Sequence, residues 1–141
     1  MIIPDAYLLI YAYDSRSPFH AKAKAWLEAL LNGEEEVGLC PVVLFAFVRI
    51  ATNARAFEQP MTVGEARGHV RYWLDEAITR LVEMDEAACL GALEFLDRAG
   101  AGANLTTDAQ IAAIAVANRA IIHSADADFY RFGMDWKNPL N

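Results

Sequence analysis

The chain has 141 residues, of which 55% are hydrophobic, and its formal net charge is −7 at pH 7. That length suits one domain with a full core, and the hydrophobic content excludes a disordered protein. No apolar run approaches the roughly 20 residues of a membrane-spanning helix, and the acidic balance excludes a broad phosphate-binding surface of Lys and Arg. The first residues lack a basic segment, so we expect no secretory signal and no membrane partner, but a cytoplasmic protein with one domain over residues 1–141.

The first half of the chain alternates short apolar segments with longer helical patterns. Pro18 suits the first turn of a helix, and Asn32-Gly33 is a typical helix end. Pro41 begins a very apolar segment whose length favours a buried helix over a strand. In chain order we predict a strand at Ile2-Ile3, a helix at 8–13, a helix from Ser17-Pro18 to Asn32-Gly33, a strand at 37–39, a helix at 42–51, and a helix from a capping box at Thr62 and Glu65 to about Asp75.

The second half continues the alternation and closes with an extended tail. The helix after residue 105 is rich in Ala and Ile, and Thr106 or Thr107 is predicted to cap it. In chain order we predict a strand at 80–83, a helix from its cap Asp85 to near Gly100, a loop at 99–105, a helix at 108–118, a buried strand at 120–123, and a tail that packs through Trp136 to Asn141. Short apolar strands alternating with helices predict an α/β fold with a parallel sheet covered on both faces.

Four aspartates lie at predicted strand ends or at a helix start, near the edge where α/β folds bind their ligands. Asp5 follows the first predicted strand, and Asp108 lies in the first turn of a predicted helix. Asp126 and Asp128 follow the strand at 120–123. Ligands of open α/β sheets bind at the carboxyl ends of the strands, so these distant acids can converge. Clustered carboxylates suit Mg²⁺, which lowers the pKa of bound water and polarises a phosphoryl oxygen, as phosphodiester hydrolysis requires.

Each of these acids also has a purely structural interpretation that the sequence leaves open. Asp5 can cap the following helix, and Asp108 suits the positive end of a helix dipole. Asp126 and Asp128 can be turn residues that bond their own backbone. Asp108 nevertheless shares one helical face with three apolar residues, which favours an inward-facing carboxylate. These residues are Ile111, Ala112 and Ala115.

Five groups of residues, spread over nearly the whole chain, follow one another in the order found in a known protein family. They are Ile2-Ile3-Pro4-Asp5 with Leu8-Leu9-Ile10-Tyr11-Ala12; Ser17-Pro18-Phe19-His20 with Ala25-Trp26-Leu27; Phe47-Val48-Arg49-Ile50-Ala51-Thr52-Asn53; Asn104-Leu105-Thr106-Thr107-Asp108-Ala109; and Ser124-Ala125-Asp126-Ala127-Asp128-Phe129. Together they resemble PIN-domain proteins, and above all the VapC toxins of bacterial toxin–antitoxin pairs. The resemblance lies in the ordered set rather than in any single motif.

The resemblance implies a fold, an activity and partners. The fold is a three-layer α/β/α sandwich around a short, mainly parallel sheet. The activity is that of a metal-dependent endoribonuclease, with Mg²⁺ or Mn²⁺ held by Asp5, Asp108 and Asp126, while Asp128 matches an auxiliary catalytic acid. The implied partners are an RNA substrate and a cognate antitoxin protein that silences the toxin. We also expect a homodimer.

Two positions depart from the family pattern. Tyr7 stands where relatives usually have Asn, and Ala46 stands where many have Glu. The missing acid favours one metal ion over two. Both departures motivate an alternative function, in which a PIN-like scaffold binds an antitoxin or RNA without cleaving it. A phosphatase or phosphoacceptor is disfavoured, because Asp5 has no acid beside it and no Lys follows a late strand.

Several other residues have a functional and a structural interpretation. Arg49 is the only charge in its apolar helix and is predicted either to meet the scissile phosphate or to form an ion pair with one of the acids. Arg55 is predicted to contact the RNA backbone or simply to be solvated. Ser124 can order metal-bound water or serve as a turn residue. We expect His123 to be a hydrogen-bonded core histidine.

We expect most of the cysteine and aromatic side chains to be buried in the core. Cys40 and Cys89 have no metal or redox spacing, so we expect two buried free thiols in a reducing compartment. Other apolar side chains are predicted to fill the core, or to form a dimer face or a groove for an antitoxin helix. They include Trp26, Tyr72, Trp73, Leu90 and Phe95.

Overall fold

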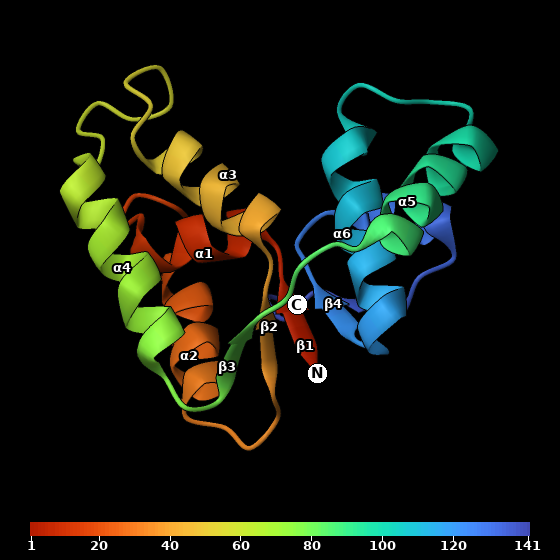
Figure 1. The fold of residues 1–141 in the computed structure, drawn as a ribbon. Helices are drawn as coiled ribbons and strands as arrows, with labels where there is room; N and C mark the ends of the chain where they lie inside the picture. The colour runs from red at the N-terminus through yellow and green to blue at the C-terminus, as the bar shows by residue number, and fades with distance from the viewer.

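A computed structural model describes residues 1–141 as a five-stranded parallel sheet between two layers of helices, which confirms the predicted fold class (Figure 1). All the strand pairs are parallel, in the order β3-β2-β1-β4-β5. The elements are β1 (Ile2–Pro4), α1 (Ala6–Tyr13), α2 (His20–Leu31), β2 (Val37–Leu39), α3 (Pro41–Ala51), α4 (Val63–Asp75), β3 (Thr79–Leu81), α5 (Glu86–Ala99), α6 (Leu105–Asn118), β4 (Ile121–His123), the 3₁₀ helix η1 (Ala127–Phe132) and β5 (Trp136–Lys137).

The sheet reverses its strand order between β1 and β4. From β1 the chain builds outward through β2 to β3, and it then crosses over to place β4 and β5 on the opposite side. Pro4 at the end of β1 is in register with His123 at the end of β4. A crevice opens at such a switch point, on the carboxyl edge of the strands. The residues that follow Pro4 and His123 therefore enter the same crevice.

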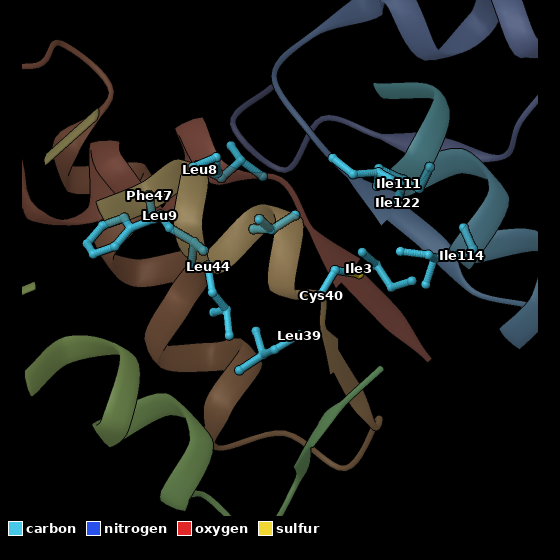
Figure 2. Packing of buried hydrophobic residues seen from close by; sticks show 14 of the residues in the cluster. Ile3, Leu8, Leu9, Leu39, Cys40, Leu44, Phe47, Ile111, Ile114 and Ile122 are labelled. Atoms are coloured by element: carbon cyan, nitrogen blue, oxygen red, sulfur yellow. The ribbon is translucent and has the colours of Figure 1, made fainter. Parts of the chain in front are cut away.

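Helices cover both faces of the sheet. Figure 1 shows α1 to α4 on one side and α5 with α6 on the other. Figure 2 shows Ile111 and Ile114 of α6 close to the sheet residue Ile122, while Leu9 and Phe47 pack on the opposite side. A single hydrophobic cluster of 35 buried residues joins these layers. None of the helices has the length and apolar character needed to cross a bilayer.

Three helix ends lie where short sequence motifs predicted them. Thr62 and Glu65 form a full capping box at the start of α4. The Asp85 side chain accepts a hydrogen bond from the Ala88 amide and caps α5. Gly100 ends α5 with a φ of 67°, a left-handed conformation that favours glycine.

Other predicted boundaries were wrong. Helix α2 begins at His20, so Pro18 lies in the preceding turn. Helix α6 begins at Leu105 after Asn104, so neither Thr106 nor Thr107 is its cap. The strand predicted at 80–83 ends at Leu81, and the tail that we expected to be simply extended contains η1 and β5. The expectation of two buried thiols holds for Cys40 only, because Cys89 is exposed on α5.

Candidate metal centre

Asp5 lies at the switch point between β1 and β4. Its amide donates to the His123 carbonyl at 2.9 Å, which extends the strand pairing by one residue. One carboxylate oxygen accepts from the Ala6 amide at 2.7 Å and thereby caps α1. The other accepts from the Ser124 hydroxyl at 2.8 Å. The carboxylate is only 7% exposed, so both oxygens are held in one fixed orientation.

Ser124 links this carboxylate to the acids that follow β4. Its side chain is completely buried, and its oxygen also accepts from the Asp126 amide at 2.9 Å. The Asp126 carboxylate in turn accepts from the Asp128 amide at 2.8 Å, at the start of η1. Asp126 is therefore a turn residue of the kind predicted, but its side chain also lies near those of Asp108 and Asp128.

Helix α6 brings in the fourth acid. The face that carries Asp108 also carries Ile111 and Ala112, which are fully buried. Packing of this apolar face turns the half-buried Asp108 toward the edge of the sheet. Asp108, Asp126 and Asp128 each offer a carboxylate oxygen within 4.8 Å of the others. We refer to these three residues as the acid cluster.

Burial and like charge make the acid cluster unfavourable without a cation. Burial, followed by the negative charges of Asp5, Asp126 and Asp128, raises the pKa of Asp108 to about 7. Burial also raises the pKa of Asp5, with a smaller contribution from Asp126 and against the hydrogen bonds from Ser124 and Ala6. A bound cation would relieve the repulsion among these carboxylates.

The donor set fits a divalent metal ion such as Mg²⁺. Carboxylate oxygens are its preferred protein ligands, and opposite ligands of a Mg²⁺ ion lie about 4.2 Å apart. The oxygens of the acid cluster, within 4.8 Å of one another, are close to this spacing. Asp5 lies beside this group but outside it. Each of its oxygens accepts one hydrogen bond, from Ala6 or from Ser124, and keeps a further lone pair for a metal ion.

The two positions that depart from the family pattern differ in exposure. Tyr7 is 52% exposed in the first turn of α1, two residues from Asp5. Ala46 is buried on α3 and offers no oxygen ligand. The carboxylates whose charges act on Asp108 are those of Asp5, Asp126 and Asp128.

The basic residues singled out from the sequence lie apart from the acids. Arg49 in the last turn of α3 is exposed and makes no ion pair, so its interpretation as an ion-pair partner of the acids was wrong. Arg55, in the segment after α3, is exposed as well. Both guanidinium groups remain available to other anions.

His123 is a structural residue, as expected. Its Nδ1 accepts a hydrogen bond from the Trp26 indole at 3.0 Å, which ties α2 to the end of β4. Burial, followed by the charge of Lys137, lowers its pKa and favours the neutral ring. The direct link from Ser124 to Asp5 was missed from sequence. The available signal was a serine immediately after a buried strand and two residues before an aspartate.

Comparisons with known proteins identify the family. A family model described as PIN domain matches residues 2–134. A Mycobacterium tuberculosis protein named Ribonuclease VapC33 is 41% identical, and the match covers 99% of each chain.

Solved structures share the fold. Mycobacterium tuberculosis VapC20, a sarcin–ricin loop cleaving toxin, has a TM-score of 0.73 at 17% identity, covering 95% of this chain and 96% of that chain. A chain of a toxin–antitoxin complex from Klebsiella pneumoniae has a TM-score of 0.66 at 14% identity, covering 99% of this chain and 98% of that chain. The family match and the full-length relative show that this chain belongs to the PIN-domain family, as a VapC-type member.

Proposed function

We propose that this chain is a metal-dependent endoribonuclease that acts as the toxin of a toxin–antitoxin pair. The observation that carries the proposal is the convergence of Asp108, Asp126 and Asp128 within 4.8 Å beside the buried Asp5. These acids come from separate segments and meet at the switch point of the sheet, where an α/β fold binds its ligand. The full-length relative named as a ribonuclease supports RNA as the substrate.

Each residue of the proposed site has a separate role in metal binding or in positioning. Asp108 and Asp126 hold one Mg²⁺ or Mn²⁺ ion together with Asp5, and Asp128 assists as an auxiliary acid. When bound, the metal supplies a water of lowered pKa and neutralises charge on the phosphoryl group. Ser124 fixes the orientation of Asp5 through its 2.8 Å hydrogen bond. The absence of a carboxylate at Ala46 supports one ion rather than two.

Arg49 and Arg55 are the proposed contacts to the RNA backbone. Both are exposed and make no ion pair with a carboxylate, so each guanidinium can meet a phosphate oxygen. The chain as a whole carries a charge of −7, so these contacts give modest affinity. The RNA substrate and the two free cysteines agree with a cytoplasmic location.

The proposed antitoxin partner has a candidate docking groove between α3 and α4. The groove has a volume of about 670 Å³, and its lining includes Phe45, which is 73% exposed. Arg67, Arg71 and Asp75 border it, and Arg71 is paired with Asp75 at 3.8 Å. A helix with apolar side chains and an acidic side chain opposite Arg67 is therefore complementary. Its apolar lining also includes Leu44, Val48, Val70, Leu74 and Leu81.

A homodimer is proposed through the opposite layer of helices. Leu90 and Leu93 on α5 and Val116 on α6 are all more than half exposed, although they are large and apolar. Large apolar side chains exposed on neighbouring helices suit a self-complementary contact. Light scattering of the purified chain checks this, and a Leu93→Asp variant should be monomeric.

A non-cleaving scaffold is the second candidate function. Exposed Tyr7 and the missing carboxylate at Ala46 favour it, since both change the surroundings of the acids. In that case the chain would bind RNA or an antitoxin, and the acid cluster would have no catalytic role.

Cleavage of bulk cellular RNA separates the two functions. The purified protein is incubated with Mg²⁺, with Mn²⁺ or with a chelator, beside Asp108→Asn and the matched control Asp97→Asn, which removes an exposed acid of α5. The nuclease predicts metal-dependent cutting that is lost in Asp108→Asn and kept in Asp97→Asn. No cutting with either metal would favour the scaffold.

A further inference from the structure

Three aromatic rings form a continuous series on the surface beside Asp5. Tyr7 and Tyr11 lie one turn apart on α1, with ring centroids 6.2 Å apart and planes tilted by 40°. Phe19, which immediately precedes α2, continues the series at 5.2 Å from Tyr11 with a tilt of 46°. Tyr7 is 52% exposed and Phe19 is 44% exposed, while Tyr11 is partly buried between them. We refer to these three residues as the aromatic ladder.

The ladder is attached to the candidate metal centre at its Tyr7 end. Asp5 caps the helix that carries Tyr7 and Tyr11, so the ladder has a fixed position relative to the buried carboxylate. Burial raises the pKa of Tyr11, with smaller contributions from the neighbouring Tyr7 side chain and from the Asp5 carboxylate.

The far end of the ladder is held by a second contact. The ring Nδ1 of His20 donates a hydrogen bond to the Tyr11 carbonyl at 2.9 Å. The Phe19 amide donates to the Ser17 hydroxyl at 3.1 Å and fixes the turn before α2. Phe19 is thus kept against Tyr11, although nearly half of its side chain faces solvent.

The other exposed aromatic residues have no such arrangement. Phe45, Tyr72 and Tyr130 are each more than half exposed, but none contacts another ring. Isolated exposed side chains of this kind are ordinary on protein surfaces. A ladder of exposed rings that begins beside a candidate phosphodiester-cleaving centre calls for a ligand with flat apolar faces.

We propose that the aromatic ladder is a stacking platform for unpaired bases of an RNA strand whose phosphate lies at the acid cluster. This inference rests on the proposed function and adds the surface that holds the bases of its RNA substrate. Bases stack on aromatic side chains irrespective of sequence, and such stacking supplies affinity without positive charge. That matters for a chain with a net charge of −7. Paired bases have both faces covered by their neighbours, so duplex RNA cannot use the platform.

Fluorescence of 2-aminopurine tests the platform directly. The probe is a single-stranded RNA of random sequence with one 2-aminopurine, whose emission falls when the base stacks. It is titrated in Mg²⁺ with the Asp108→Asn protein, which prevents cleavage of the probe. We expect quenching on binding, and about tenfold weaker binding with less quenching when Tyr7→Leu or Phe19→Leu is added.

Two further variants separate stacking from other effects. Tyr7→Phe keeps the ring and should restore both affinity and quenching. Tyr72→Leu removes a tyrosine of similar exposure, 56%, on α4, which is not part of the ladder, and should change neither. In a fully paired hairpin the 2-aminopurine is already quenched by its neighbours, so protein should cause no further loss of emission and should bind more weakly. Wild-type affinity and quenching in Tyr7→Leu, or equal binding of the hairpin, would overturn the proposal.

Cleavage kinetics distinguish failure of the platform from failure of the proposed nuclease. With active protein, Tyr7→Leu should raise KM about tenfold and leave kcat nearly unchanged, because stacking binds substrate and transition state alike. Active protein whose KM is unaffected by Tyr7→Leu refutes the platform alone. Protein that never cleaves RNA but shows ring-dependent quenching refutes the nuclease and retains the platform. If Tyr7→Leu instead weakens only antitoxin binding, the ladder is a protein-binding surface and the proposal fails.

Discussion

Replacing Asp108 by Asn removes one charge from the acid cluster at nearly constant side-chain size. The pKa of Asp108 is raised from 3.8 to about 7 by burial and by Asp5, Asp126 and Asp128. Such a shift corresponds to about 4 kcal/mol for a fully buried group. Asp108 is half-buried, so solvent screening reduces the effect to about 1–2 kcal/mol.

The sign of this contribution follows from the direction of the pKa shift. The folded protein holds the proton of Asp108 more tightly than the unfolded chain does. The resulting stability is fully present below the unfolded pKa of 3.8 and is lost as the pH rises through about 7. At pH 8 without metal, the Asn variant is therefore expected to be more stable than the wild-type protein by about 1–2 kcal/mol. At pH 4 the two should differ little.

Thermal unfolding in chelator, at pH 4 and pH 8, measures this difference. For a chain of this size, 1–2 kcal/mol raises Tm by roughly 2–8 °C, so Asp108→Asn should exceed wild type by that amount at pH 8. Added Mg²⁺ should raise the wild-type Tm and leave that of the variant nearly unchanged. Asp97→Asn is the control for a general change of charge. Equal Tm values at pH 8 in chelator, or an equal Mg²⁺ effect in both proteins, would refute the reasoning.

Three further substitutions test other parts of the structure. Ser124→Ala leaves an Asp5 oxygen buried without its partner, so it should cost about 1–3 kcal/mol in urea unfolding and reduce Mg²⁺-dependent cleavage; an unchanged midpoint would contradict the link. Trp73→Ala removes a fully buried ring and its 2.9 Å bond to Tyr13, and should cost about 3–5 kcal/mol, measured by the same unfolding; a loss below about 1 kcal/mol would contradict this packing. Phe45→Asp should abolish co-purification with the antitoxin and leave RNA cleavage intact, whereas retained binding would exclude the groove between α3 and α4.

Local chemistry made much of the fold predictable. The capping box at Thr62, the Asp85 cap and the left-handed Gly100 each depend on residues within one helical turn. The apolar segment after Pro41 could be assigned to a helix because of its length and its proline. These signals do not require knowledge of which strands pair.

The elements that were missed depend on distant contacts. The strand β5 has only two residues and exists because Trp136 and Lys137 pair with β4. Helix α6 begins at Leu105, which is buried, whereas the cap motif expected at Thr106 or Thr107 lies inside the helix. Tertiary packing therefore outweighed the local capping preference at this end.

The candidate site was predictable as a set of residues but not as an arrangement. Strand ends indicated Asp5 and Asp126, and the helical register indicated that Asp108 faces inward. Sequence alone gives no pairing of β1 with β4, so it could not show that Ser124 lies against Asp5. Nor could it show that Asp128, rather than Asp5, offers the third oxygen within 4.8 Å.

Sulfur substitution in the RNA gives the most direct test of metal-assisted cleavage by this chain. An RNA that the protein cuts is transcribed with sulfur in place of one non-bridging oxygen of each phosphate, and its cleavage is compared in Mg²⁺ and in Mn²⁺. Mg²⁺ prefers oxygen, whereas Mn²⁺ accepts sulfur more readily. We predict that sulfur slows cleavage in Mg²⁺, that Mn²⁺ restores it, and that Asp108→Asn abolishes it in both. Cleavage that is unaffected by sulfur and continues in chelator would contradict a metal held by the acid cluster.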